Sequence, residues 1–210
     1  FIDVQHDKCK YYKYLEQKKV PIVPTFCTTL GEWKGANSKA ALVDKIFAQA
    51  KQRGFKQTFV KPVMGTSGSF TTMFPAEGET SAAAKARIAK HLGSVFAKDY
   101  PKVVFQEFVP EFATDTLEVR MMFVGDKYQY SIVSESRGNG NGEAYGMAAI
   151  KNEGGTYSYD PKLRNRLRKM GEGVMKKIQP LFGKLPKLVT RVDVGCCLNG
   201  KGYFVNEIEY

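Results

Sequence analysis

The chain has 210 residues and a formal net charge of +11, because 32 lysine and arginine residues outnumber 21 aspartate and glutamate residues. Hydrophobic residues make up 43% and aromatic residues 12%, values close to globular averages, which excludes a disordered, collagen-like or coiled-coil chain. No apolar run reaches the ~18 residues of a membrane span, and the first ten residues lack a signal-peptide core. We therefore expect a globular, cytoplasmic protein whose charge suits a nucleic acid, an anionic membrane or a small polyanion such as a nucleotide.

Cysteine usage bears on the redox compartment. The four cysteines are Cys9, Cys27, Cys196 and Cys197. They contain no CxxC spacing, and only His6 and His91 could help them to ligate a metal. We therefore expect reduced thiols in a reducing compartment, with neither a zinc site nor a disulfide framework.

The N-terminal half is predicted to contain helices and strands in mixed order. Asp7 and Ser38 are suitable N-caps for two amphipathic helices, and Gly54 ends the second. Short runs of alternating or continuous apolar residues indicate strands. The predicted elements are, in chain order, a helix over 8–18, a helix over 38–53, strands over 58–62 and 69–74, a helix over 81–98 and a strand over 103–109.

The C-terminal half contains two predicted hairpins and the strongest helical pattern in the chain. Asp160 is the expected N-cap of that helix, with Pro161 at its first position. Because hairpins outnumber βαβ units, we expect an α+β protein with mainly antiparallel sheets. The predicted elements are strands over 117–124 and 127–134, a Gly/Asn-rich loop over 137–146, a helix over 161–182, and strands over 188–195 and 203–209.

The segment FVKPVMGTSGSF at 59–70 is the first candidate site. Lys61 lies near the end of an apolar strand and supplies a positive charge. Glycines and hydroxyl residues after it would let backbone N–H groups approach an anion. The pattern is not a Walker A loop, and, for this segment taken alone, an ordinary hairpin turn is the favoured interpretation. The loop residues concerned are Gly65, Thr66, Ser67, Gly68 and Ser69.

The strand TLEVRMMFV at 116–124 is the second candidate. Its period of two places Glu118 and Arg120 on the same face, about 7 Å apart. Such a pair could bind a sugar hydroxyl and a phosphate. The alternative is a solvated face that carries a charge pair.

The hairpin at 190–210 is the most informative segment. An odd-length loop centred on Gly200 would pair Asp193 with Glu207 and Arg191 with Glu209, and we predict this register. A two-residue turn would instead place Asp193 and Glu207 on opposite faces.

Three clustered carboxylates repel one another unless a hard cation neutralises them. Carboxylate oxygens completed by phosphate oxygens are typical ligands of Mg²⁺. We therefore predict metal ligation by Asp193, Glu207 and Glu209, with Mn²⁺ as the alternative ion. The competing interpretation is a surface hairpin whose acidic residues point outward.

In this order and spacing, these segments resemble the ATP-grasp fold of ADP-forming carboxylate ligases. The resemblance covers almost the whole chain. HDKCKYYKYLEQKKVPIVPTF is similar to the family's lysine-bearing helix and the proline-containing segment after it. FVKPVMGTSG resembles its glycine-loop strand, VVFQEFVP its adenine linker, and the 191–207 segment its metal-binding strands.

The resemblance implies a role for each matched residue. Lys8 and Lys61 would bind the ATP phosphates, with residues 65–69 as the lid over them. Glu107 would face the adenine amino group, with the backbone of Phe108 and Val109 alongside, and Glu118 would hold the ribose hydroxyls. The proposed catalytic residues are Arg120, aimed at phosphate or an acyl phosphate, and Arg191, which would steady an oxyanion.

Two departures from the family pattern matter. Position 209, usually Asn, is Glu, which could alter the number of metals held. The chain also begins at Phe1 without an initiator Met, where an N-terminal substrate domain would have ended, so we expect an ATP-binding core from a larger enzyme. Its expected division is a helical segment over 1–54, a small lid subdomain over 55–110 and a larger subdomain over 111–210.

The implied activity is an ATP- and Mg²⁺-dependent ligase. It would join a small-molecule or peptide carboxylate to an amine through an acyl phosphate, releasing ADP and phosphate. Two alternatives remain: a sugar or inositol phosphate kinase of the same fold, and a Mg-ATP-binding module without catalysis. Arg137 and the 138–146 loop either assist the chemistry or form a disordered connection.

No nucleic-acid partner is expected, because the basic residues mostly lie on the polar faces of amphipathic helices and no RNP, KH or zinc-finger signature is present. No membrane partner is expected either. The oligomeric state is open.

Overall fold

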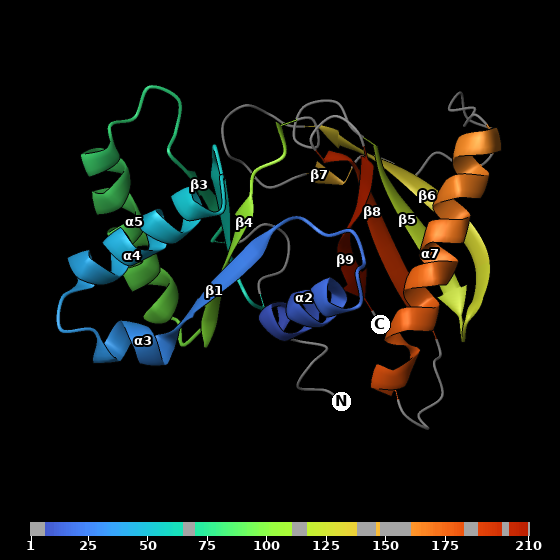
Figure 1. The fold of residues 1–210 in the computed structure, drawn as a ribbon, viewed down its shortest axis with the longest axis horizontal. Helices are drawn as coiled ribbons and strands as arrows, with labels where there is room; N and C mark the ends of the chain where they lie inside the picture. The colour runs from blue at the N-terminus through green and yellow to red at the C-terminus, as the bar shows by residue number, and fades with distance from the viewer. Residues whose placement is uncertain are drawn as a thin grey trace.

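The computed structural model describes residues 7–64, 70–110, 117–137, 146–147, 161–182, 189–198 and 202–209. These residues form two halves, each built on an antiparallel sheet, and Figure 1 shows α2 (Lys8–Gln17) between them. The predicted α+β class with mainly antiparallel sheets is confirmed.

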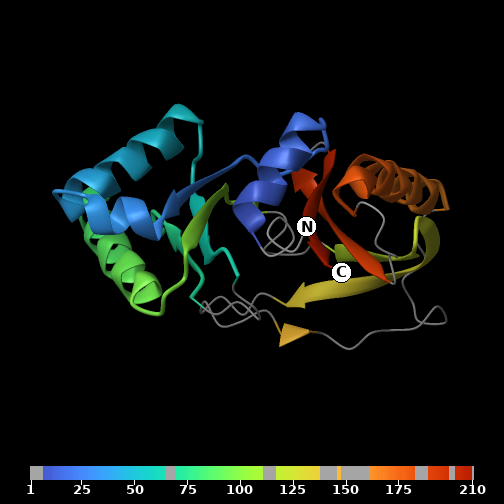
Figure 2. The ribbon, with the colours of Figure 1, turned by 90° about the horizontal axis from the view of Figure 1, so that it is seen from below.

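The smaller half has a four-stranded sheet with helices on one side of it (Figure 2). Apolar residues of its two longer helices, including Ile46 and Ile88, form one core with Val60 and Phe105 of the sheet. The strand order is β1 (Thr25–Thr29), β4 (Lys102–Glu107), β2 (Thr58–Pro62) and β3 (Thr72–Phe74). The helices are α3 (Leu30–Gly35), α4 (Lys39–Gln52) and α5 (Ser81–Phe96).

The segment 25–52 thus contributes β1, α3 and α4 to the smaller half. It falls within the N-terminal segment predicted over 1–54. The structure pairs β1 with β4 along its whole length, from Thr25 opposite Gln106 to Thr29 opposite Lys102. Among the described residues before β1, the buried residues of α2 belong to a different core from that of this half.

The larger half has a five-stranded sheet covered on one side by α7 (Pro161–Phe182). Met121 and Phe123 of the sheet pack against Leu167 and Met175 of this helix. Gly171 faces the sheet at close range, because a Cβ atom there would be 2.8 Å from the sulfur of Met121. The strand order is β7 (Gly146–Met147), β6 (Lys127–Arg137), β5 (Leu117–Val124), β8 (Thr190–Leu198) and β9 (Gly202–Glu209).

Helix α2 packs in a core shared with residues of both halves. Asp7 is its N-cap and accepts hydrogen bonds from the N–H groups of Cys9 and Lys10. The buried face of α2, with Tyr12 and Leu15, belongs to a core that includes residues of both halves. An element in this position can carry side chains to both sheets at once.

The four predicted helices are present as α2, α4, α5 and α7, and α3 was not predicted. Six residues are too few to show a clear hydrophobic period. The start of α3 is fixed by a capping box, in which Thr29 and Glu32 each bond the backbone N–H of the other. None of the helices in the part of the chain that the structure describes combines the length and apolar character needed to cross a membrane.

The expectation of reduced cysteines is wrong for one pair. Cys9 of α2 and Cys27 of β1 form a disulfide, with Cα atoms 6.2 Å apart. The packing of α2 beside β1 brings together two residues that are 18 positions apart in the sequence. The cysteines therefore do not support the expectation of a reducing compartment. The side chains of Cys196 and Cys197 lie outside the described set.

Candidate functional site

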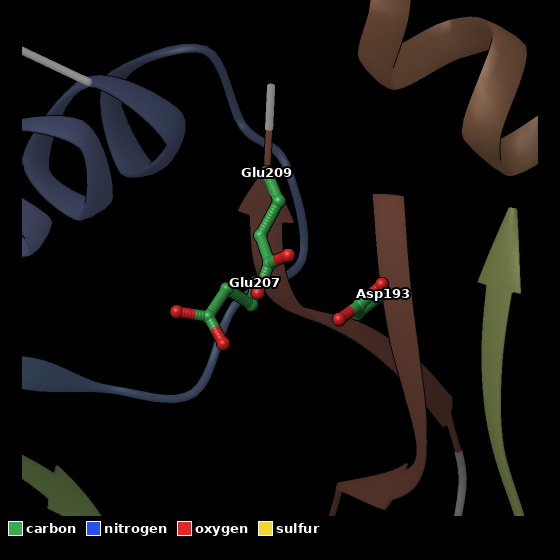
Figure 3. A group of neighbouring side chains, drawn as sticks. All are labelled: Asp193, Glu207 and Glu209. Carbon is green, nitrogen blue, oxygen red and sulfur yellow. The ribbon is translucent and has the colours of Figure 1, made fainter. Parts of the chain in front are cut away.

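The hairpin of β8 and β9 has the predicted register at the acidic positions. Asp193 lies opposite Glu207, and Arg191 lies opposite Glu209. Asp193 is buried, Glu207 is half-buried and Glu209 is exposed. One carboxylate oxygen from each lies within 4.8 Å of the other two. Figure 3 shows Asp193 on β8 and Glu207 and Glu209 on β9, with the Glu207 carboxylate turned away from Asp193.

Arg191 binds two of these carboxylates. Its guanidinium donates two hydrogen bonds of 2.7 Å to Asp193 and lies 2.8 Å from Glu209. Burial raises the pKa of Asp193 to about 6, with a contribution from the negative charge of Glu118, although Arg191 opposes the shift. The hydrogen bonds that Arg191 donates to Asp193 raise the pKa of Arg191, which stays cationic.

Lys8 and Lys61 lie beside the third carboxylate. The Nζ atom of Lys8 is 2.8 Å from Oε1 of Glu207. Burial acts to raise the pKa of Glu207, but the charges of Lys8 and Lys61 outweigh it, and the pKa is lowered. Glu207 is therefore ionised at neutral pH. The two lysines, which come from α2 and β2, thus meet the acidic hairpin at one place.

Glu118 and Arg120 extend the site along β5. Arg120 lies opposite Asp193 in the sheet, and its Nη2 atom is 2.8 Å from Glu118. Asn206 donates a hydrogen bond of 2.9 Å to the same carboxylate. Glu118 is only 8% exposed, so these partners fix its direction.

A β-bulge in β9 brings Asn206 into the site. Val194 pairs with Val205 and Asp193 with Glu207, so Asn206 has no residue opposite it. In a regular strand Asn206 and Glu207 would point to opposite faces. The extra residue of a bulge changes this alternation, and both side chains here reach site residues, Glu118 and Lys8.

The expected adenine linker follows β4. Burial raises the pKa of Glu107, and the positive charge of Lys56 opposes the shift. The N–H groups of Glu107 and Phe108 donate to the carbonyls of Pro24 and Gln57, at 3.0 and 2.8 Å. Val109 is buried.

Some predicted residues lie outside the described part of the chain. They are Gly65, Thr66, Ser67, Gly68 and Ser69 of the glycine loop, and residues 138–145. Arg137 is the last residue of β6, and its side chain is outside the described set. The residues on both sides of the loop are described: Val63 and Met64, which follow β2, before it, and Phe70 after it.

Several contacts of the site were not predicted from the sequence. Tyr12 donates to the carbonyl of Asn206 at 2.7 Å and accepts from Lys61 at 3.2 Å. Asp7 also pairs with Lys102 of β4. A tyrosine on a helical apolar face is usually a core residue, so no signal in the sequence distinguished Tyr12.

The donor set suits a small hard cation. All three candidate ligands are carboxylates, the ligand type of Mg²⁺. Octahedral coordination at about 2.1 Å places ligand oxygens about 3.0 to 4.2 Å apart, so small rotations from the present separations suffice. A bound metal would contact carboxylate oxygens that now contact Arg191 and Lys8. The carboxylates of Asp193, Glu207 and Glu209 suit such an ion in type and spacing.

No protein-family model and no curated protein sequence matches the chain. Solved structures match its fold. D-cycloserine synthetase DcsG has a TM-score of 0.71 at 17% identity, over 99% of this chain and 63% of that one. D-alanyl-alanine synthetase A from Vibrio cholerae has 0.65 at 15% identity, over 98% and 55%.

The ATP-grasp ligase PsnB, solved with a minimal precursor, Mg and ADP, has a TM-score of 0.54 at 16% identity, over 99% of this chain and 50% of that one. The chain thus spans between half and about two thirds of the length of these structures. Identities below 20% establish the fold and not the activity. The arrangement of its two sheets and the matches along nearly its whole length show that the chain has the ATP-grasp fold.

Proposed function

We propose that the chain is the ATP-binding core of a ligase that activates a carboxylate as an acyl phosphate and joins it to an amine. The observation that carries this proposal is the convergence of Lys8 and Lys61 on Glu207, beside Asp193. Two cations next to a carboxylate cluster suit a metal-bound polyphosphate, because each charge type then has a partner in the ligand.

The nucleotide would lie between the two sheets. Lys8, Lys61 and the loop 65–69 would bind its phosphates, and Glu118 would accept hydrogen bonds from the ribose hydroxyls. Because two linker N–H groups are already bonded within the protein, the carbonyls of Glu107 and Phe108, with Val109, are the backbone groups proposed for adenine.

The chemistry begins with transfer of the γ-phosphoryl group. A substrate carboxylate oxygen attacks γ-phosphorus, and the bond to the β-phosphate oxygen breaks, so that ADP leaves. Mg²⁺ held by Asp193, Glu207 and Glu209 would supply positive charge at the phosphate oxygens. Lys8, Lys61 and Arg120 hold these oxygens in line and offset the charge that moves.

The second step joins the amine. Its nitrogen attacks the acyl carbon, a C–N bond forms, the C–O bond to phosphate breaks, and the ammonium nitrogen gives up a proton. Arg191 lies between Asp193 and Glu209 and would steady the oxyanion on the acyl carbon. The carboxylate and amine are proposed as amino-acid or peptide groups, by analogy with the synthetase and precursor complexes named above.

Binding of Mg-ATP is tested by calorimetric titration of wild type, Lys61→Ala and Asp193→Asn. We expect each variant to lose at least about 10-fold in affinity, since each removes a charged contact to the ligand. Lys85→Ala is the matched control, because Lys85 pairs with Asp44 on the outer helices. Unchanged affinity for Mg-ATP in both site variants would contradict the proposed nucleotide site.

The reaction class is tested by ADP release with panels of carboxylates and amines. Release that needs both a carboxylate and an amine supports the ligase. Release with a sugar or inositol phosphate alone would show a kinase, and binding without release under any condition would show a nucleotide-binding module.

A further inference from the structure

Tyr12 links the two halves of the molecule at the candidate nucleotide site. It lies on the buried face of α2 and is 2% exposed. Its hydroxyl donates a hydrogen bond of 2.7 Å to the carbonyl of Asn206 in β9, and it lies 3.2 Å from Nζ of Lys61 in β2. One hydroxyl thus contacts the metal-binding hairpin and the strand before the glycine loop.

The bulge of β9 explains why Tyr12 can reach this carbonyl. Asn206 has no partner residue in β8, so its backbone is displaced from the regular ladder. The side-chain amide of the same residue donates to Glu118 at 2.9 Å. Tyr12 therefore contacts the residue that orients the predicted ribose ligand.

The direction of each hydrogen bond follows from the atoms involved. A carbonyl only accepts, so the single proton of the Tyr12 hydroxyl is used on Asn206. The lone pairs of the hydroxyl then remain for Lys61, whose ammonium only donates. The ammonium lies 5.4 Å from the centre of the Tyr12 ring, on the side of the hydroxyl group. The donor and acceptor roles of the Tyr12 hydroxyl are therefore fixed, and the hydrogen bond favours one position of the Lys61 ammonium.

We propose that Tyr12 is a positioning residue that fixes Lys61 relative to β9, so that the ammonium is already in place when the phosphates bind. This inference rests on the proposed function, in which Lys61 is a phosphate ligand. Side-chain order before binding lowers the entropic cost of binding, and a lysine otherwise has much freedom to lose. The benefit should therefore appear in phosphate binding and not in adenosine binding.

The experiment compares Tyr12→Phe with wild type in titrations of Mg-ATP and of adenosine. We expect about a fivefold loss of affinity for Mg-ATP and less than about a twofold change for adenosine. Tyr14→Phe is the matched control, because Tyr14 is on the same helix and its hydroxyl also donates to a backbone carbonyl, that of Lys177, at 2.9 Å. The control should leave both affinities unchanged.

A second measurement separates positioning from general destabilisation. In a Lys61→Met background, Tyr12→Phe should no longer affect Mg-ATP binding, because its effect passes through Lys61. An equal loss in both backgrounds would overturn the inference, as would equal losses for Mg-ATP and adenosine. Thermal unfolding of Tyr12→Phe and Tyr14→Phe reports whether the folded state persists under the titration conditions.

The outcomes distinguish this inference from the proposed function. If wild type binds Mg-ATP and Tyr12→Phe binds it equally well, the positioning role is wrong and the proposed function stands. If wild type binds no Mg-ATP, the proposed function fails, and the role of Tyr12 fails with it.

Discussion

Arg191 binds Asp193 through two hydrogen bonds of 2.7 Å, and the aspartate is only 1% exposed. Removing one partner of a buried ion pair leaves a charge without compensation, which costs about 3 to 5 kcal/mol. Because Arg191 is itself partly exposed, we expect Arg191→Met to lower the free energy of unfolding by about 3 kcal/mol. Urea denaturation at pH 8 with a chelator present measures this value.

Two variants control this experiment. Arg191→Met combined with Asp193→Asn should cost less than Arg191→Met alone, because no buried charge remains unpaired. Arg168→Met removes an exposed pair with Glu172 on α7 and should cost less than about 1 kcal/mol. An Arg191→Met variant as stable as Arg168→Met would show that the buried pair contributes little.

The second prediction concerns the base of the glycine loop. Arg87 of α5 binds Glu79 through two hydrogen bonds and also donates to the Thr72 side chain and the Met73 carbonyl of β3. The hydrogen bonds that Glu79 accepts from Arg87 and from the Ala76 N–H lower the pKa of Glu79 from 4.5 to about 2. Because the folded pKa is below the unfolded one, the stabilisation is complete above pH 4.5 and decreases as the pH falls towards 2.

Glu79→Gln should therefore melt at a lower temperature than wild type at pH 7, and the difference should shrink steadily between pH 4.5 and pH 3. The matched control is Glu77→Gln, since Glu77 is an exposed residue of the same turn. Thermal unfolding followed by circular dichroism gives both values. A difference that stays constant over this range would contradict the assignment.

The register of β8 and β9 was predictable because the acidic positions themselves restrict it. Only an odd loop brings Asp193 opposite Glu207, and the structure has this pair. The bulge was not predictable, since two register shifts, one on each side of Val194–Cys196, cancel before the acidic positions are reached. A prediction made from the acidic positions alone cannot detect two register shifts of opposite sign between those positions and the turn.

Contacts between distant segments were the least accessible from the residues alone. Lys8 and Glu207 are 199 positions apart, and only the resemblance to ATP-grasp proteins placed them together. The resemblance did not indicate the contacts of Tyr12 or the Cys9–Cys27 disulfide. Their environment depends on how α2 packs between the sheets, which helical periodicity does not specify.

The third prediction concerns the disulfide between Cys9 and Cys27, which closes a loop across a separation of 18 residues. A loop of this length restricts the unfolded chain, so Cys9→Ser combined with Cys27→Ser should lower the free energy of unfolding by about 3 kcal/mol. Urea denaturation measures the loss. A reductant should destabilise wild type by a similar amount and leave the double variant unchanged.

Alkylation provides an independent check of this bond. Without reductant, mass spectrometry of the denatured, alkylated protein should find the Cys9 and Cys27 peptides unmodified and linked to each other. Full alkylation of both residues in unreduced protein would contradict the bond.

The last prediction compares two glycines of α7. Ala at position 171 would place its Cβ 2.8 Å from the Met121 sulfur and 3.1 Å from Phe123, whereas position 173 has nothing within 4 Å. Both substitutions gain the same helix propensity, about 1 kcal/mol, so the difference between them isolates the packing. Gly171→Ala should be less stable than Gly173→Ala by about 1 to 2 kcal/mol, in the lower range for overpacking, because the thioether of Met121 can move. Equal stabilities in urea denaturation would mean that α7 shifts away from β5 at negligible cost.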